Sequence, residues 1–164
     1  MSLLLTVIVV ALIFEYINGF HDTANSIATV VSTKVLTPRL AIMLAAVTNL
    51  VGALYGTAVA KTISSGLLDA KLIPAELATQ ALICALGGAI VWNLLTWWFG
   101  LPSSSSHALI GGLVGSGIAA ASNNFAVVIL SKPKAGVPWY KFDGLLYKVI
   151  IPMFLSPVMG FTVG

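Results

Sequence analysis

Charged side chains are what this sequence most lacks. They make up 8% of the 164 residues, whereas soluble domains average roughly 25%. Hydrophobic residues account for 59% of the chain, and the mean hydropathy is +1.03. This composition predicts an all-α, polytopic membrane protein embedded in a lipid bilayer. The net charge of +3 is small and spread among connecting segments, so a nucleic-acid partner is not indicated.

Cysteine is almost absent, because Cys84 is the only one. The chain therefore has no disulfide framework and no cysteine metal site of its own. Since Cys84 lies in an apolar run, we expect a buried packing thiol. A basic leader is also missing before the apolar residues 2–14. Glu15 and Asn18 follow without a small-x-small cleavage pattern, which favours a retained first membrane helix over a signal peptide.

Long apolar runs define the expected membrane spans, since about 20 residues cross a bilayer core of ~30 Å. We expect Gly19 to separate the first span from a short polar half-helix, so the chain would contain discontinuous or re-entrant helices. Lys and Arg number two or three in each of three connections, which leaves the membrane orientation open. The expected spans cover residues 2–19, 40–60, 77–99, 104–130 and 145–163, with the polar half-helix at 20–34 and a loop at 131–144.

The most polar stretch of the first 60 residues runs from Gly19 to Thr29. An acidic group inside a hydrophobic helix is unfavourable unless it is paired or used, so we expect Asp22 to be functional. Asp22 and Asn25 supply oxygens suited to a small cation or a proton. Glu15 has either a functional role or a lysine partner near the interface. Polar residues recur here at steps of three and four, which places them on one helical face: Glu15, Asn18, Asp22, Asn25, Ser26, Thr29 and Thr33.

A second polar stretch, GLPSSSSH, interrupts the apolar pattern at residues 100–107. Glycine and proline end one helix there, and a helix rich in small residues follows. The N-terminus of such a helix carries unpaired N–H groups and a partial positive charge, which suit an oxyanion. Ser103 to Ser106 add hydroxyl donors at the same place. Discontinuous helices of this kind are a common device of secondary transporters.

Simpler interpretations of these residues stay open. Each serine can bond its own backbone or a neighbouring helix, and His21 and His107 can be hydrogen-bonded structural residues. Asn49 and Asn93 are expected to form hydrogen bonds between helices. The small residues Gly111, Gly115 and Ala119 recur every four positions and are expected to form a packing face.

An enzymatic site is not indicated. Ser106 and His107 are neighbours, and neighbours on a helix point about 100° apart, which argues against activation of one by the other. His21, Asp22 and His107 lack the His-x₃-His spacing of a strong metal motif. We therefore expect neither catalysis nor a resident metal or cofactor.

Two motifs resemble signatures of the inorganic phosphate transporter family. Residues 19–29, GFHDTANSIAT, resemble G-x-[NH]-D-x-A-N-x-x-x-T. Residues 100–112, GLPSSSSHALIGG, resemble G-[LV]-P-x-S-[ST]-[ST]-H followed by a glycine-rich helix. The order of the motifs and Trp92-Asn93 upstream of the second also fit. His21 stands where sodium-coupled members commonly have asparagine, and this is similar to the bacterial low-affinity subgroup, which is taken to be proton-coupled.

The resemblance implies an inverted-repeat fold that binds inorganic phosphate near the middle of the cell membrane. It implies proton-coupled symport by alternating access, with sodium as the alternative co-ion and a metal–phosphate complex as a second form of the cargo. Sulfate is the nearest competing substrate, but phosphate retains a proton that it can donate to a carboxylate. The implied phosphate ligands are Ser103, Ser104, Ser105, Ser106 and Thr23, and the implied cation or proton residues are Asp22, Asn25, His21, His107 and Glu15.

Family members carry both motifs twice and are more than twice as long as this chain, which holds one copy of each. The resemblance therefore implies an N-terminal repeat that pairs with a second repeat or with another copy of itself. A hypothesis of a different class is a non-transporting membrane subunit, in which the polar faces only bind neighbouring helices.

Overall fold

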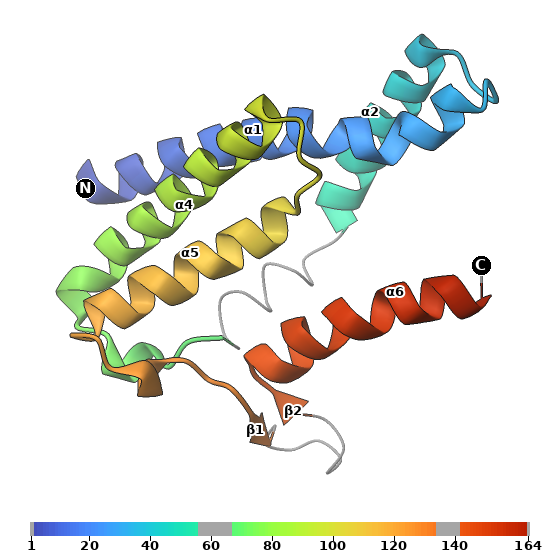
Figure 1. Cartoon of the computed structure of the whole chain (residues 1–164). Coiled ribbons are helices and arrows are strands. Elements are labelled where there is room, and N and C mark those ends of the chain that lie inside the picture. Colours follow the sequence, from blue (N-terminus) through green and yellow to red (C-terminus); the bar gives the residue numbers. More distant parts are fainter. Residues whose placement is uncertain (1, 56–66, 134–141, 164) are drawn as a thin grey trace. The chain divides into compact units, whose positions relative to one another are not determined.

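The computed structural model describes residues 2–55, 67–133 and 142–163 (Figure 1). These residues are mostly helical, as the composition predicts. The chain divides into two units, residues 1–57 with 79–116 and residues 58–78 with 117–164. Each unit is described by itself.

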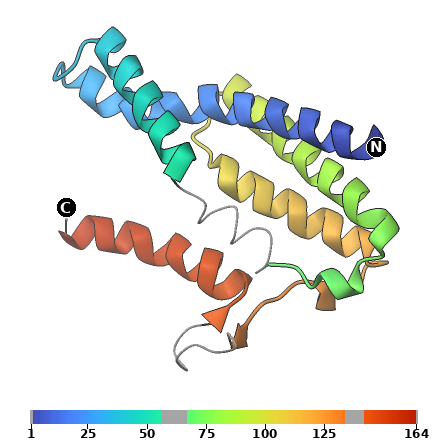
Figure 2. The ribbon, with the colours of Figure 1, turned by 180° about the vertical axis from the view of Figure 1, so that it is seen from behind.

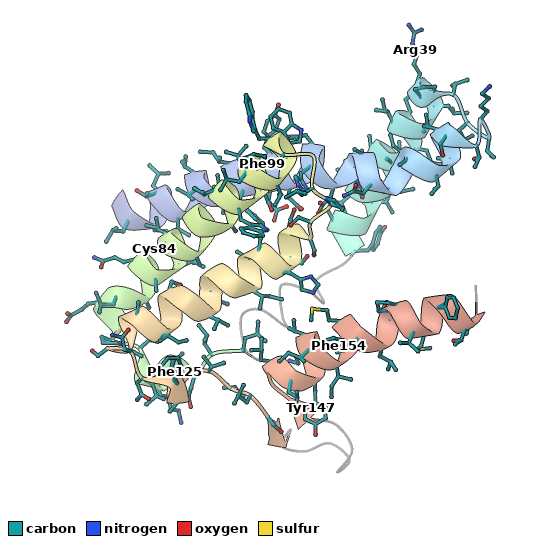
Figure 3. The ribbon with its side chains drawn as sticks, viewed as in Figure 1. Arg39, Cys84, Phe99, Phe125, Tyr147 and Phe154 are labelled. Carbon is teal, nitrogen blue, oxygen red and sulfur yellow. The ribbon has the colours of Figure 1, made fainter. Side chains whose placement is uncertain are left out.

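The first unit contains most of the long helices. They are α1 (Ser2–Ser32), α2 (Pro38–Tyr55), α4 (Ala75–Trp98) from residue 79 onward, and α5 (Ser105–Ala120) up to residue 116. Figures 1 and 2 show α4 beside α1 and α5 beside α4, while α2 folds back from the end of α1. Arg39 extends away from the ribbon at the turn between α1 and α2 (Figure 3).

The expected break at Gly19 is wrong, because α1 is one continuous helix. A lone glycine lowers helix stability by only about 1 kcal/mol relative to alanine, and no proline follows it closely to stop the helix. Phe14, Ile17 and His21 are all buried. They form one stripe that spans Gly19 at three- and four-residue steps. Packing of this stripe stabilises the helix on both sides of Gly19, so the helix is continuous there.

The helix α1 ends in a Schellman motif, in which two backbone amides bond back to the last turn. The amide of Lys34 donates to the carbonyl of Val31 at 3.1 Å, and that of Val35 donates to Val30 at 3.1 Å. Lys34 has a φ of 59°, the left-handed conformation that this motif requires. Pro38 then occupies the first position of α2, where its missing N–H is tolerated.

The predicted interruption between residues 98 and 105 is present. The amide of Gly100 donates to Trp97 at 3.1 Å and that of Leu101 donates to Thr96 at 2.8 Å, a second Schellman motif. Gly100 supplies the required positive φ of 64°. Glycine and proline act together here, whereas Gly19 stands alone, and this explains why only one of the two predicted breaks occurs.

Helices α1, α4 and α5 share an apolar core formed by Phe14, Leu86 and Ala89. A Cβ atom on Gly112 would lie 2.5 Å from the carbonyl oxygen of Ala85, so only glycine permits this approach of α5 to α4. The core is bordered by the partly buried residues Val10, Ala11, Ile90, Ala108 and Leu109.

Two packing expectations are wrong within the described residues. Gly111 and Gly115 have open space around the position of a Cβ atom, so the contact is made one residue away, through Gly112. Cys84 is exposed, because the buried stripe of α4 runs through Ala85 and Ala89 and turns the thiol outward. An apolar run in a membrane helix therefore does not indicate on which face a residue lies.

The second unit begins with an antiparallel pairing of two extended segments. The amide of Asp69 donates to Val127 at 2.8 Å, and that of Ile129 donates to Leu67 at 2.9 Å. Leu67 and Val127 are fully buried at this pairing. The remaining elements are η1 (Ala70–Leu72), η2 (Phe125–Val127), β1 (Lys132–Pro133), β2 (Phe142–Asp143), η3 (Leu146–Ile150) and α6 (Ile151–Val163).

The expected span 104–130 is shorter than predicted, because α5 ends at Ala120. Ser122 and Asn123 both have positive φ values, 56° and 63°, and they turn the chain out of the helix. The expected loop 131–144 contains β1 and β2, and its residues 134–141 lie outside the described residues. Residues 56–60 of the second expected span also lie outside them.

Four helices of the described residues are long and apolar enough to cross a membrane. They cover residues 3–32, 38–55, 75–98 and 146–163. Large apolar side chains face outward along them, for example Leu12 at 65% exposure and Phe154 at 66%. Such surfaces suit lipid, so the described part of the chain has the architecture of a multi-pass membrane protein.

Candidate functional site

A cavity of about 530 Å³ lies at the N-terminal end of α5. Its polar lining comes from Trp92 on α4, Ser103 and Ser104 in the connection, and His107 on α5. Small residues complete the wall and leave room for a ligand: Gly88, Ala108, Gly111 and Gly112. Cavities of a few hundred Å³ with a few placed polar groups are typical binding sites for small molecules.

The connection that forms the cavity is held by two side-chain hydrogen bonds. The indole Nε1 of Trp92 donates to the hydroxyl oxygen of Ser103 at 3.0 Å. The hydroxyl of Ser104 accepts from the amide of His107 at 3.4 Å, while its carbonyl accepts from Ala108 at 3.0 Å. Ser104 therefore acts as the N-cap of α5. The amides of the first turn have no partner within the helix and can serve an anion.

Two polar side chains are buried here without a hydrogen-bond partner among the described residues. They are the hydroxyl of Ser105, at 1% exposure, and the amide of Asn93, at 0%. Buried polar groups are almost always paired, but neither of these two residues lines the cavity. The interhelical hydrogen bond expected for Asn93 is absent in this part of the chain, and that expectation is wrong.

A second polar cluster centres on His21, which is 7% exposed. Its Nδ1 lies 2.8 Å from the Oδ1 of Asp22, and its Nε2 lies 3.2 Å from the hydroxyl of Thr96 on α4. The hydroxyl of Thr96 also lies 3.0 Å from the carbonyl of Trp92 and 3.2 Å from that of Asn93. The side chain of Asp22 is 42% exposed, so the pair lies between the protein core and the surface.

The other predicted site residues lie apart from these two clusters. Glu15, Asn25 and Ser106 are exposed. The hydroxyl of Thr23 donates to the carbonyl of Gly19 within α1. A smaller cavity of about 280 Å³ lies between α1 and α2, where Ser26, Thr48 and Asn49 supply its polar lining.

The structure thus brings Ser103, Ser104 and His107 together around one cavity and joins His21 to Asp22 in a separate network. Among the described residues, no direct hydrogen bond joins Ser103, Ser104 or His107 to His21 or Asp22. Trp92 belongs to both, because its carbonyl lies beside Thr96 and its indole bonds to Ser103. Sequence reasoning placed neither Trp92 nor Thr96 in the site. The available signals were the position of Trp92 upstream of the second motif and the shared face of Asn93 and Thr96.

The described residues contain no cluster of three or more His, Cys, Asp or Glu that could hold a metal ion. The donors around the cavity are instead hydroxyls, an indole, an imidazole and helix amides. Such neutral donors suit an oxyanion.

The fold defines a helical, multi-pass membrane protein, and its polar cavity lies at the N-terminal end of α5. A profile of the phosphate transporter family matches residues 18–164. The chain belongs to the phosphate transporter family.

Similar proteins from other bacteria are named as inorganic phosphate transporters. The chain is 50% identical to a protein of Streptomyces halstedii over 165 residues, which is all of this chain and 68% of the relative. It is 48% identical over 162 residues, 99% of its length, to a protein of Mycobacterium tuberculosis H37Rv. Both relatives are named "Probable low-affinity inorganic phosphate transporter". The "Low-affinity inorganic phosphate transporter PitA" of Escherichia coli K12 is 42% identical over 168 residues and 96% of the chain.

The chain spans 34% of the mycobacterial relative and 30% of the Escherichia coli relative. The names of these relatives describe transporters, which are not enzymes. No solved structure matches the chain significantly.

Proposed function

We propose that this chain forms part of a secondary transporter of inorganic phosphate in the plasma membrane. The cavity at the N-terminus of α5 binds the phosphate in this proposal. The observation that carries it is the cavity lining, where Ser103, Ser104 and His107 lie together at the first turn of α5. A hydroxyl in that position can donate to an oxyanion that also accepts from the helix amides.

The phosphate site is built from neutral donors. Ser103 and Ser104 line the cavity with His107, and no Lys or Arg occurs between Lys71 and Lys132. Neutral donors hold an anion less tightly than a salt bridge would, because charge-assisted hydrogen bonds are roughly twice as strong. Moderate binding suits a transporter, which must release its cargo on the other side of the membrane.

The transport cycle in this proposal is alternating access between two repeats. This chain contributes one repeat, and the other comes from a second repeat or a second copy. The positive end of α5 faces the phosphate, as half-helix N-termini face anionic groups in other transporters. Asp22 and Asn25 contribute to the co-ion side of the completed site.

We favour a proton as the co-ion and phosphate over sulfate as the cargo. The partly buried contact between His21 and Asp22, at 2.8 Å, supports a site that exchanges protons. Phosphate is favoured over sulfate because hydrogen phosphate keeps an O–H that it can donate to a carboxylate such as that of Asp22, whereas sulfate has none.

Uptake of radiolabelled phosphate by cells that produce the transporter with this sequence tests the proposal. Asp22→Asn and Asn25→Ala should abolish uptake while membrane insertion and protein level stay normal. Glu76→Gln is the matched control, since Glu76 is an exposed carboxylate in the first turn of α4, and its uptake should equal that of the unmodified protein. Normal uptake in both site variants would refute the site, and absence of uptake in the unmodified protein would refute the function.

A further inference from the structure

We infer that Thr96 is a positioning residue whose hydroxyl group reverses its hydrogen bond when His21 gains or loses a proton. The inference rests on the proposed function in one respect only, namely that the proton is the co-ion. His21 is the buried member of the pair, with its side chain 4% exposed against 42% for Asp22. Both of its ring nitrogens have a partner within hydrogen-bond distance.

The neutral state of His21 follows from counting protons. A carboxylate accepts only, so the Nδ1 atom 2.8 Å from Asp22 carries the single ring proton and donates it. The Nε2 atom is then an acceptor, and the hydroxyl of Thr96 at 3.2 Å donates to it. The pair of His21 and Asp22 has a net charge of −1 in this state.

The protonated state requires the opposite direction of the second bond. A proton from water binds Nε2, which becomes a donor, and the oxygen of Thr96 accepts from it. The hydroxyl proton of Thr96 then points to the carbonyl of Trp92 at 3.0 Å or to that of Asn93 at 3.2 Å. The net charge of the pair rises from −1 to 0, and every donor keeps an acceptor.

The hydroxyl of Thr96 can point either to His21 or to the carbonyls of its own helix. The carbonyls of Trp92 and Asn93 already accept backbone bonds inside α4, since they lie in the helix interior. Each of these carbonyls therefore keeps one hydrogen bond when the hydroxyl of Thr96 turns away from it. A buried histidine without such a partner would leave either a donor or an acceptor unpaired in one of its two states.

Few other charges act on His21. The helix α4, against which it packs, has no charged residue after Glu76 in its first turn. The titratable residue of α5 is His107, and on α1 the charged neighbours are Asp22, in contact, and the exposed Glu15. Asp22 and the hydroxyl of Thr96 are thus the groups that face the imidazole.

Trp92 places the proton site next to the anion cavity. Its carbonyl receives the hydroxyl of Thr96 in the protonated state, and its indole holds Ser103 at 3.0 Å on the wall of the cavity. A change in the direction of the Thr96 hydroxyl therefore alters the hydrogen bonding of a residue that lines the cavity.

The test is a pH titration by NMR of the transporter in nanodiscs, with histidine labelled by ¹⁵N. The His21 signal is assigned by its loss in His21→Gln, and His107 serves as an internal control. Thr96→Val keeps the shape of the side chain but removes the hydroxyl. It should change the titration midpoint of His21, because the ring loses a partner that can donate to Nε2 in one state and accept from it in the other.

Thr96→Ser retains a hydroxyl and should restore the midpoint to within a few tenths of a pH unit. Thr162→Val is the matched control, since the hydroxyl of Thr162 also bonds two carbonyls of its own helix, at 3.0 and 3.1 Å. An unchanged His21 midpoint in Thr96→Val, with the protein folded as judged by its His107 signal, would overturn the inference.

Transport measurements separate this inference from the proposed function. In Thr96→Val, uptake driven by an inward proton gradient should fall to the rate of phosphate exchange that the same variant shows without a pH gradient. A shifted His21 midpoint in a protein that moves no phosphate would support the role of Thr96 and refute phosphate transport. A normal midpoint with normal gradient-driven uptake would refute the role of Thr96 alone.

Discussion

The Nε2 atom of His21 lies 3.2 Å from the hydroxyl oxygen of Thr96, a residue 75 positions further along the chain. This contact joins α1 to α4 in the interior of the first unit. It gives a buried, titratable ring two partners, Thr96 on one side and Asp22 on the other. A histidine held in this way can carry a proton without leaving a buried polar group unpaired.

Replacement of His21 by glutamine should uncouple transport from the proton gradient. The glutamine amide can still bond to Thr96, but it does not titrate between pH 5 and 8. We expect phosphate exchange to persist, and accumulation of phosphate to become independent of an imposed pH gradient. Proteoliposome uptake at several external pH values measures this. A His21→Gln variant that still responds to the proton gradient would show that the co-ion uses another group.

Replacement of Asn93 by leucine should make the protein more stable. The amide of Asn93 is fully buried without a partner among the described residues, and removal of such a group relieves a penalty of about 1–3 kcal/mol.

Thermal unfolding in detergent tests this prediction. Asn49→Leu is the matched control for stability, because Asn49 is exposed and its replacement relieves no buried group. Lower stability of Asn93→Leu would mean that the amide is paired in the folded protein.

Replacement of Gly112 by alanine should loosen the packing of α5 on α4. The added Cβ would lie 2.5 Å from the carbonyl oxygen of Ala85, and backbone atoms can move away only by separating the helices. Overpacking of this kind lowers stability by about 1–3 kcal/mol. In Gly115→Ala the added Cβ has open space, so its melting temperature should match or exceed that of the unmodified protein. Equal melting temperatures for the two variants would be evidence against close α4–α5 packing.

Features with several agreeing local signals could be predicted from the sequence. The break after Trp98 combines glycine, proline and a run of serines, and the structure has a Schellman motif and an N-cap there. The break at Gly19 relied on one residue, and the buried stripe of Phe14, Ile17 and His21 holds the helix intact. The overall class of the protein was predictable because a chain so poor in charge and so rich in apolar residues suits a lipid bilayer far better than water.

Contacts between distant segments could not be predicted in the same way. The pairing of His21 with Thr96 depends on the register of α1 against α4, which apolar residues such as Phe14 and Leu86 set through their packing. The contact through Gly112 instead of Gly111 depends on the rotation of α5 about its axis. Ser105 and Asn93 lack a hydrogen-bond partner because of how the surrounding segments pack, and the sequence alone does not indicate this.

Uptake of radiolabelled phosphate into proteoliposomes under separate imposed gradients tests the central claim most directly. The transporter with this sequence is reconstituted and given an inward proton gradient, an inward sodium gradient or neither. We predict accumulation of phosphate with the proton gradient alone, and a strong reduction in Ser105→Ala, which removes the buried hydroxyl at the start of α5. No accumulation under any gradient would contradict phosphate transport, and accumulation driven by sodium alone would contradict the proton site at His21.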